Sequence, residues 1–473
     1  MVRVHRSSVN GHHSWWPFFF VTNMKVNKID MTTGAIFPKL FQFAVPLILS
    51  SVLQLLFNAA DIVVVGRFAG DNALAAVGST SSLINLLVNL FVGLSIGCNV
   101  SAASAFGAKK FREVSRTVHT AVALSFIGGI ILTVAGLVLS RKILLLMSVP
   151  EEVLPLSIEY LRIYFGGITA TVIYNFGSAL LRGKGDTQRP LYILLAAGFI
   201  NVFLNLVFVI VFKMNVKGVA WATVISQCFS AFCVLLLLVK EKDEFALHFK
   251  YLKIYPQILK RILKIGIPAG VQGIIFSFSN VVIQSTVNSF GAVCVAGNSA
   301  CQSIESFIYI SMNGISQASL TFSSQNMGCK KINRVKESVA VSLLAVIFVG
   351  GLLGILALIF DDALFSIYTK NPQVVEAGKL RLFIICTTYF TCGLMDVMAN
   401  SIRGMGYSFL PMVVTLIGAC GIRLVYLFTV FTLPSVHSFR NIFISYPVSW
   451  IVTFLILSVI FMTLLKKETV SLS

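Results

Sequence analysis

Residues 50–70, SSVLQLLFNAADIVVVGRFAG, form an apolar stretch of helix length that contains one carboxylate, Asp61. About 20 apolar residues cross about 30 Å of hydrocarbon as an α-helix. An ionisable side chain inside such a helix costs roughly 2.5–3.5 kcal/mol, and it usually faces a cavity or a partner and marks an ion path. By helical rise Asp61 lies about 9 Å from Arg67, too deep for a simple contact at the helix end. Asp61 is therefore the first candidate for function.

The composition of the whole chain is that of a polytopic membrane protein. Of its 473 residues, 57% are hydrophobic and 12% are charged, whereas soluble globular domains carry about 25% charged residues. The strands of a membrane β-barrel would be about half as long as these apolar runs, and alternating. The pattern predicts an all-α fold with twelve spans, at 40–66, 74–105, 118–140, 156–181, 190–212, 218–239, 262–286, 296–325, 338–360, 378–402, 409–432 and 441–465.

The basic residues follow the loops rather than one folded face. The net charge is +19, but a nucleic-acid-binding protein gathers its Lys and Arg residues on one surface. Here the loops after the even-numbered spans are enriched in Lys and Arg, as at Lys109, Lys110, Lys330 and Lys331. The positive-inside rule then places both termini in the cytoplasm. We expect a lipid bilayer and small molecules as partners, no nucleic acid, and a monomer.

The motifs of catalysis and of structural metal sites are missing from the sequence. The nine cysteines are an odd number without a C-x-x-C pair, and the six histidines do not form H-E-x-x-H, so neither a disulfide framework nor a structural metal site is predicted. A phosphate loop of the G-x-x-x-x-G-K-[ST] type is also missing. The sequence predicts no enzyme and no cofactor, and an ion gradient as the source of energy.

The two halves of the chain repeat each other. Residues 180–190, LLRGKGDTQRP, match residues 401–411, SIRGMGYSFLP, and residues 106–114, FGAKKFREV, match 327–335, MGCKKINRV, both at an offset of 221. Each repeat holds six spans, so both enter the membrane in the same sense and are related by a pseudo-twofold axis along the membrane normal. The predicted domains are a cytoplasmic tail (1–38), an amino-terminal lobe (39–239), a cytoplasmic linker (240–261), a carboxy-terminal lobe (262–465) and a second cytoplasmic tail (466–473).

Together these landmarks resemble the multidrug and toxic compound extrusion (MATE) family. The motifs that carry the resemblance are NAADIVVVGRFAG, ALAAVG, FGAKK, the paired LRGKGD and IRGMGY turns, and MDVMANSIRG. They cover residues 34–465, and the prokaryotic damage-inducible-type branch is the most similar. The resemblance implies a V-shaped cavity between two lobes and export of amphipathic, often cationic compounds in exchange for Na⁺ or H⁺, in the inner membrane of a bacterium.

The resemblance also implies roles for particular residues. Asp61 matches the coupling aspartate of the first span, and Asp396 matches an acid on the tenth span of one branch. Another branch carries an Asn-x-x-x-Asp pair on the fifth span, where this chain has Asn201 and Asn205. We therefore predict that Asp61, Asn201, Asn205 and Asp396 couple transport to a cation. The coupling ion is either H⁺ or Na⁺, and Na⁺ would bind transiently at Asp61.

The remaining polar residues of the spans have two interpretations each. Asp396, Glu305 and Arg423 could tie helices together or could contact substrate or cation, and Arg423 requires either a carboxylate such as Asp396 or a position facing the pore. Asn58 and Asn175 could bind a cation or join helices by hydrogen bonds. Pro46 removes a helical hydrogen bond and is predicted to act as a hinge of the first span.

The sequence is most consistent with a secondary antiporter for multidrug efflux that works by alternating access. The alternative is a flippase for lipid-linked precursors, which would need basic residues in its cavity to meet a diphosphate. A membrane enzyme or receptor would need a catalytic cluster or a large soluble domain, and the sequence predicts neither.

Overall fold

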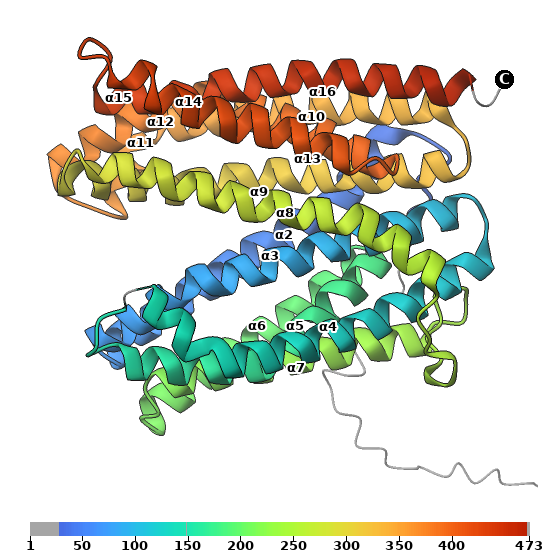
Figure 1. The fold of residues 1–473 in the computed structure, drawn as a ribbon, viewed down its shortest axis with the longest axis horizontal. Coiled ribbons are helices and arrows are strands. Elements are labelled where there is room, and N and C mark those ends of the chain that lie inside the picture. The colour runs from blue at the N-terminus through green and yellow to red at the C-terminus, as the bar shows by residue number, and fades with distance from the viewer. Residues whose placement is uncertain (1–27, 148, 471–473) are drawn as a thin grey trace, which may run out of the picture.

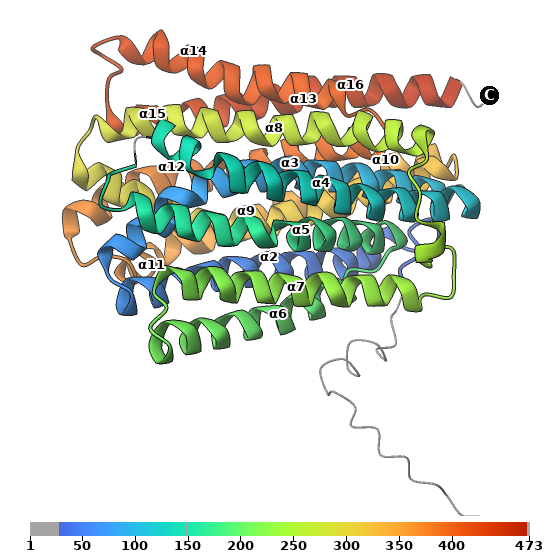
Figure 2. The same ribbon diagram turned by 60° about the horizontal axis from the view of Figure 1, so that its bottom comes forward.

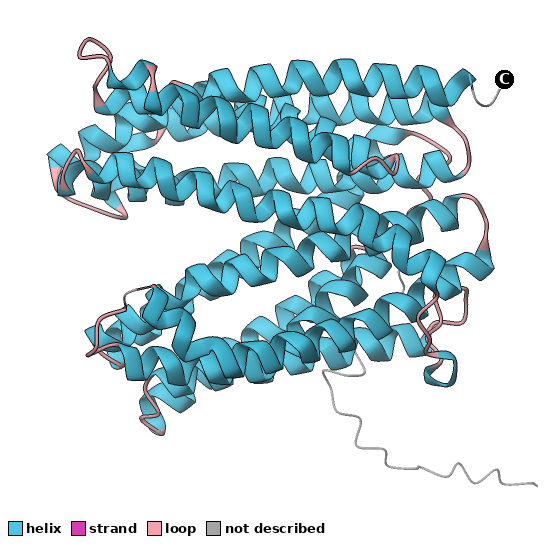
Figure 3. Cartoon of the chain, viewed as in Figure 1, coloured by secondary structure: helices cyan, strands magenta, loops and turns pink. Residues whose placement is uncertain are grey.

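The computed structural model describes residues 28–147 and 149–470, and within them the chain is helical apart from its loops (Figures 1 and 3). Twelve long helical segments follow the predicted spans within a few residues at most ends. They are α2 (Ile36–Phe68), α3 (Asp71–Gly107), α4 (Phe111–Leu146), α5 (Leu154–Lys184), α6 (Gln188–Leu206) with its π-helical extension η1 (Val207–Val211), α7 (Val216–Lys240), α8 (Pro256–Asn288), α9 (Ala292–Gly328), α10 (Ile332–Ile359), α12 (Pro372–Gly404), α13 (Phe409–Thr415) joined by the π-helical η3 (Leu416–Gly421) to α14 (Ile422–Phe428), and α16 (Ser445–Val470).

Short elements complete the described chain. Two short α-helices, α11 (Asp361–Ser366) and α15 (Phe439–Ile442), and two 3₁₀ turns, η2 (Phe249–Tyr251) and η4 (Val430–Thr432), lie in the connections. The first 27 residues of the predicted amino-terminal tail and residues 471–473 lie outside the described residues. The last long helix runs on to Val470, beyond the expected end of the twelfth span.

Ten helices of the described chain are long and apolar enough to cross a membrane. The other two long helices, α5 and α9, are 31 and 37 residues long but more polar. Both lie inside their half and contact several neighbouring helices, so polar residues such as Ser316 and Gln325 of α9 are buried against protein. On the outer helices, large apolar side chains such as Phe203, Phe348 and Val459 are more than 60% exposed, as expected for surfaces that face lipid.

The molecule has two halves, α2–α7 and α8–α16, which lie close together at one end and diverge toward the other (Figure 1). In both views α6 and α7 lie on one side and α14 and α16 on the opposite side (Figure 2). The first helix of each half packs across the boundary, α2 against α9 and α8 against α3. Accordingly, Leu40 and Phe43 of α2 belong to the core of the second half, and Ile262 of α8 belongs to the core of the first half.

Glycines allow the halves to touch at the end where they converge, which we call the closed end. A Cβ atom on Gly107 would collide with the Gln325 carbonyl, and one on Gly328 would collide with the Ser104 carbonyl. These two glycines belong to the repeated 106–114 and 327–335 motifs. The repeat therefore places a backbone-to-backbone contact between α3 and α9 at the closed end.

Residues 28–34 cross the closed end and bind both halves; we call this segment the strap. On the first half, Lys28 forms an ion pair of 2.7 Å with Asp243, and the Ile29 amide donates to the Gly185 carbonyl. On the second half, the Arg334 guanidinium donates to the carbonyls of Met31, Thr33 and Gly34 at 3.0, 2.6 and 2.8 Å. The strap thus links the halves through charged hydrogen bonds, which are stronger than neutral ones.

The segment after α7 is held to the same end by a buried ionic network. The fully buried Lys184 ammonium lies 2.5 Å from Glu241 and 2.6 Å from Asp243, and Arg189 contacts Glu241 at 2.5 Å. Burial alone would raise the pKa of Asp243, but hydrogen bonds from Lys184 and Lys28 hold this pKa below its ordinary value. The start of the connection between the halves is therefore anchored to the first half.

Candidate functional site

The predicted residues Asp61, Asn201 and Asn205 meet in the first half. Asn201 and Asn205 lie one turn apart on the buried face of α6, and the Asn205 side-chain amide donates to the Asp61 carboxylate of α2. The same amide lies 3.3 Å from the Asn201 oxygen, and the Asn201 amide donates to the Thr223 hydroxyl of α7 at 3.4 Å. A polar chain therefore joins three helices; we call it the Asp61 cluster.

The Asp61 cluster is rich in oxygen atoms and poor in positive charge. Asp61 forms no ion pair among the described residues, and the side-chain oxygen of Asn205 is buried without a hydrogen-bond donor. Carboxylate, amide and hydroxyl oxygens are the ligands that hard cations take. Groups of three or more His, Cys, Asp or Glu able to hold a metal are not found in the described part of the chain. The arrangement suits a proton or a weakly held monovalent cation.

The helix that carries the two asparagines changes its geometry next to them. Directly after Asn205 and Leu206, residues 207–211 form the π-helical turn η1, and the equivalent helix of the second half contains η3 before Arg423. Such π-helical turns are rare and often occur at functional sites. In each half a π-helical turn thus adjoins one of the predicted site residues.

A cavity of about 550 Å³ lies between α3 and the helices of the second half. It is lined by charged and amide side chains as well as aromatic rings, including Asp396, Arg403, Arg423, Asn280, Asn313, Tyr389, Tyr446 and Trp450. A neighbouring cavity of about 430 Å³ shares five of its residues: Asn280, Tyr309, Tyr389, Tyr446 and Trp450. We call the two together the carboxy-half cavity. Its size lies within the range of small-molecule sites.

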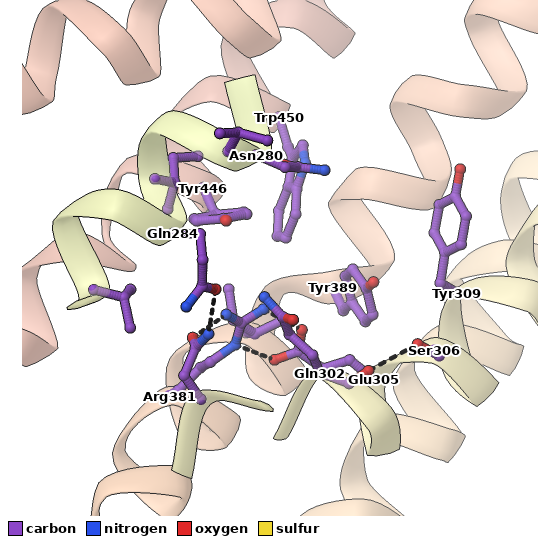
Figure 4. Close-up of a pocket in the computed structure, with 15 residues that line it drawn as sticks. Asn280, Gln284, Gln302, Glu305, Ser306, Tyr309, Arg381, Tyr389, Tyr446 and Trp450 are labelled. Atoms are coloured by element: carbon purple, nitrogen blue, oxygen red, sulfur yellow. Dashed lines mark hydrogen bonds and ion pairs between the residues drawn. The ribbon is translucent and has the colours of Figure 1, made fainter. Parts of the chain in front are cut away.

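Glu305 and Arg381 form an ion pair at one end of the carboxy-half cavity. Arg381 Nη2 lies 2.6 Å and Nε 2.9 Å from the two Glu305 oxygens, and both residues are about 95% buried. Figure 4 shows the rings of Tyr309, Tyr389 and Trp450 on the same side of this pair. Glu305 therefore joins α9 to α12 through Arg381 and also lines the cavity. Arg381 lies near the beginning of α12, and no sequence signal linked it to Glu305.

Asp396 and Arg403 lie seven residues apart on α12 and both line the larger cavity. Asp396 shares this cavity with Arg403 and Tyr309, while Arg403 Nη1 donates to Asn400 at 2.7 Å and Nη2 to Gln272. Arg403 was expected in a loop, but it is 93% buried. The side-chain amide oxygens of Asn400 on α12 and Gln272 on α8 accept from its two terminal nitrogens, whereas its Nε is buried without a hydrogen-bond partner.

Arg423 faces the cavity without a carboxylate. It is 97% buried, its Nε donates to the Ser449 hydroxyl at 2.8 Å, and its guanidinium carbon lies 4.1 Å from the centre of the Tyr446 ring. Among the described residues no carboxylate forms an ion pair with it. Of the two positions that the sequence left open for Arg423, the structure shows the pore-facing one, and Asp396 is not its partner.

Comparison with known proteins identifies the family. The sequence profile of the MatE family matches residues 46–207 and 268–429, once in each half. The chain belongs to the MATE family.

Similar proteins support this assignment over nearly the whole length. The probable multidrug resistance protein YoeA of Bacillus subtilis is 27% identical over 91% of this chain and 94% of its own. The probable multidrug resistance protein NorM of Thermotoga maritima is 28% identical over 82% and 84%, respectively. A solved outward-facing MATE transporter of the MOP superfamily has the same fold, with a TM-score of 0.86 at 18% identity over 94% of this chain and all of its own. The chain is a multi-pass membrane transporter and not an enzyme.

The other predicted residues of this MATE transporter form no hydrogen bond with either group among the described residues. Asn58 is exposed on α2, and the Asn175 amide donates at 2.9 Å to the Thr171 carbonyl of its own helix. The first helix continues through Pro46, whose carbonyl accepts a bond of 2.7 Å from Ser50. The structure thus does not join Asn58 or Asn175 to the Asp61 cluster by a hydrogen bond, and the hinge at Pro46 stays a prediction.

Proposed function

We propose that this MATE transporter is a secondary antiporter that exports amphipathic, often cationic compounds in exchange for H⁺ or Na⁺. The observation that carries the proposal is the hydrogen bond from Asn205 to Asp61 inside the membrane, beside a buried Asn205 oxygen that has no donor. An intramembrane carboxylate with such partners is typical of ion and proton paths. The multidrug resistance names of YoeA and NorM support efflux as the direction of transport.

The coupling step that we propose is a change of charge at Asp61. As a carboxylate, Asp61 accepts the Asn205 amide hydrogen; once protonated, it can instead donate to the free Asn205 oxygen after rotation of the amide group. A Na⁺ ion would use the same oxygens. Either cation alters the contact between α2 and α6, and it can bias the two states of the transporter only through its differential affinity for them.

The two ends of the molecule differ, and this difference indicates which side of the membrane the cavity faces. Because the strap and the basic loops gather at the closed end, we propose that this end is cytoplasmic and that the cavity opens to the outside of a bacterial inner membrane. For the cavity to open to the cytoplasm, the strap contacts and the contact at Gly107 would have to break. Rocking of two parallel repeats about a site between them is the general mechanism of such folds.

The arginines of the carboxy-half cavity bear on the flippase alternative. A lipid-linked diphosphate would need several free basic groups. Arg381 is paired with Glu305, and Arg403 is held by Asn400 and Gln272, which leaves Arg423. One free guanidinium suits a compound with a single acidic group better than a diphosphate.

Reconstitution tests the proposal. Purified transporter in liposomes is loaded with a cationic dye such as ethidium, and the Na⁺ and H⁺ gradients are varied independently. We expect dye movement to follow one of the two gradients and to stop when that gradient is dissipated. Dye movement that is indifferent to both gradients would overturn the proposal.

A further inference from the structure

The carboxy-half cavity contains more positive than negative groups. Three arginines line it, Arg381, Arg403 and Arg423, against two carboxylates, Glu305 and Asp396. Glu305 holds Arg381 through two charged hydrogen bonds, and Asp396 lies two turns before Arg403 on α12 and lines the cavity with it. The guanidinium that remains without a counter-charge is Arg423.

The terminal nitrogens of Arg423 are available to a ligand. Only its Nε has a hydrogen-bond partner among the described residues, the Ser449 hydroxyl. A buried charge is expensive unless it is paired and hydrogen-bonded. A planar guanidinium fork matches a carboxylate or phosphate with two parallel hydrogen bonds. An oxyanion would therefore supply the partner that the chain does not.

The aromatic rings around Arg423 argue against a cation at the same place. The guanidinium carbon lies 4.1 Å from the Tyr446 ring centre and 5.4 Å from that of Trp450. Arg423 thus already occupies the cation–π positions of these two rings. The rings of Tyr309 and Tyr389 also line the cavity and are left to contact a flat apolar body.

The Asp61 cluster and the carboxy-half cavity therefore have opposite polarity. The Asp61 cluster has one carboxylate and no ion pair among the described residues, whereas the carboxy-half cavity has an excess guanidinium. A cation and an acidic group of the substrate could each find its complement in a different half. The cation site and the substrate site would then not overlap. They would be coupled through the helices that cross between the halves.

We propose that Arg423 binds an acidic group of the transported compound, and that this compound is a soluble, flat aromatic molecule carrying a carboxylate or a phosphate-type group. The inference rests on the proposed transport function and names its substrate class. It does not conflict with a positive charge elsewhere on the compound, because a zwitterion carries both. The cavity then selects for the acidic group, and the rings hold the aromatic body.

The test compares two dyes that differ in one carboxylate. Tetramethylrhodamine as the free acid and as its methyl ester are titrated with the purified full chain in phosphatidylcholine nanodiscs, and binding is followed by fluorescence polarisation. We expect the wild type to prefer the acid. Arg423→Gln should weaken binding of the acid by about tenfold or more and leave the ester unchanged, while the exposed control Arg67→Gln changes neither.

The outcomes separate this proposal from the antiport proposal, because binding needs no gradient. Equal or tighter binding of the ester by the wild type would overturn the inference, and this result does not depend on any variant folding. An equal loss of both dyes in Arg423→Gln would also overturn it. Addition of phosphatidylglycerol to the nanodisc distinguishes the sources of the anion: competition that disappears in Arg423→Gln would overturn the soluble substrate in favour of a lipid headgroup.

Discussion

Removal of one partner of the Glu305–Arg381 pair should destabilise the transporter far more than removal of both. Both side chains are buried and joined at 2.6 and 2.9 Å. Breaking such a pair costs about 3–5 kcal/mol because a charge is left buried alone, whereas replacing both partners by apolar groups of similar size is often neutral. The pair therefore predicts a coupling energy of about 3 kcal/mol or more in a double-mutant cycle.

The contacts around the pair predict which of the two single variants loses more stability. In Glu305→Gln, Arg381 keeps its hydrogen bond of 2.5 Å to Asn298 and its place over the Phe443 ring, so we expect a loss near 3 kcal/mol. In Arg381→Met, Glu305 keeps only the weak Cys301 thiol donor at 3.1 Å. This variant should lose about 5 kcal/mol, and the double variant Glu305→Gln/Arg381→Met should recover most of the loss because it leaves no charge buried alone.

Thiol labelling offers an assay for this cycle. Cys98, Cys233 and Cys386 are free and buried, whereas Cys228 is exposed, so in a Cys228→Ser background a thiol-reactive dye reports unfolding of the purified protein in detergent by the labelling of the buried thiols. Lys379→Gln on the same helix is the matched control, because its partly exposed pairs with Asp361 and Asp362 should contribute no more than about 1 kcal/mol. A Glu305→Gln variant as stable as wild type, or a double variant no better than Arg381→Met, would refute the reasoning.

Three further predictions concern the closed end. Gly107→Leu should force α3 away from the Gln325 backbone and open this end, which a site-specific spin-label distance between the halves would detect; an unchanged distance would contradict the contact. Arg334→Gln should free the strap, so that the amides of residues 28–34 exchange their hydrogens at least tenfold faster, whereas unchanged exchange would show that the strap holds without it. The pKa of Asp243 is held below 3.8, so Asp243 should stabilise the linker fully above about pH 4 and lose this effect at lower pH. Hydrogen exchange of the linker amides measures this stability. If the linker already lost its protection between pH 7 and 5, this result would argue against the ion pairs.

The sequence was sufficient for the architecture because the features that determine it are local or repeated. Apolar runs predict spans, and the 221-residue offset predicts two parallel halves. The Asp61 cluster could also be predicted from the sequence, because Asn201 and Asn205 lie one turn apart on one helix face and the resemblance paired them with Asp61. The domain boundaries within the loops stay predictions.

The second half was harder to predict because its site depends on distant contacts. Arg381 looked like a terminal residue of its span, and only the packing of α12 on α9 brings it to Glu305, 76 residues away in sequence. Arg403 similarly looked like a loop residue until Gln272 of α8 was placed beside it. Arg423 could be recognised as buried, but whether it faced a carboxylate or the cavity depended on the register between helices.

The most direct test of the account measures how the coupling cation changes dye affinity in wild type and in Asp61→Asn. This substitution keeps the shape of the side chain and removes its titratable charge. If Asp61 is the coupling group, raising the H⁺ or Na⁺ concentration should shift the dye dissociation constant of the wild type by about fivefold or more, and it should leave that of Asp61→Asn unchanged. An equal shift in the two proteins would contradict the central claim that the Asp61 cluster binds the coupling cation.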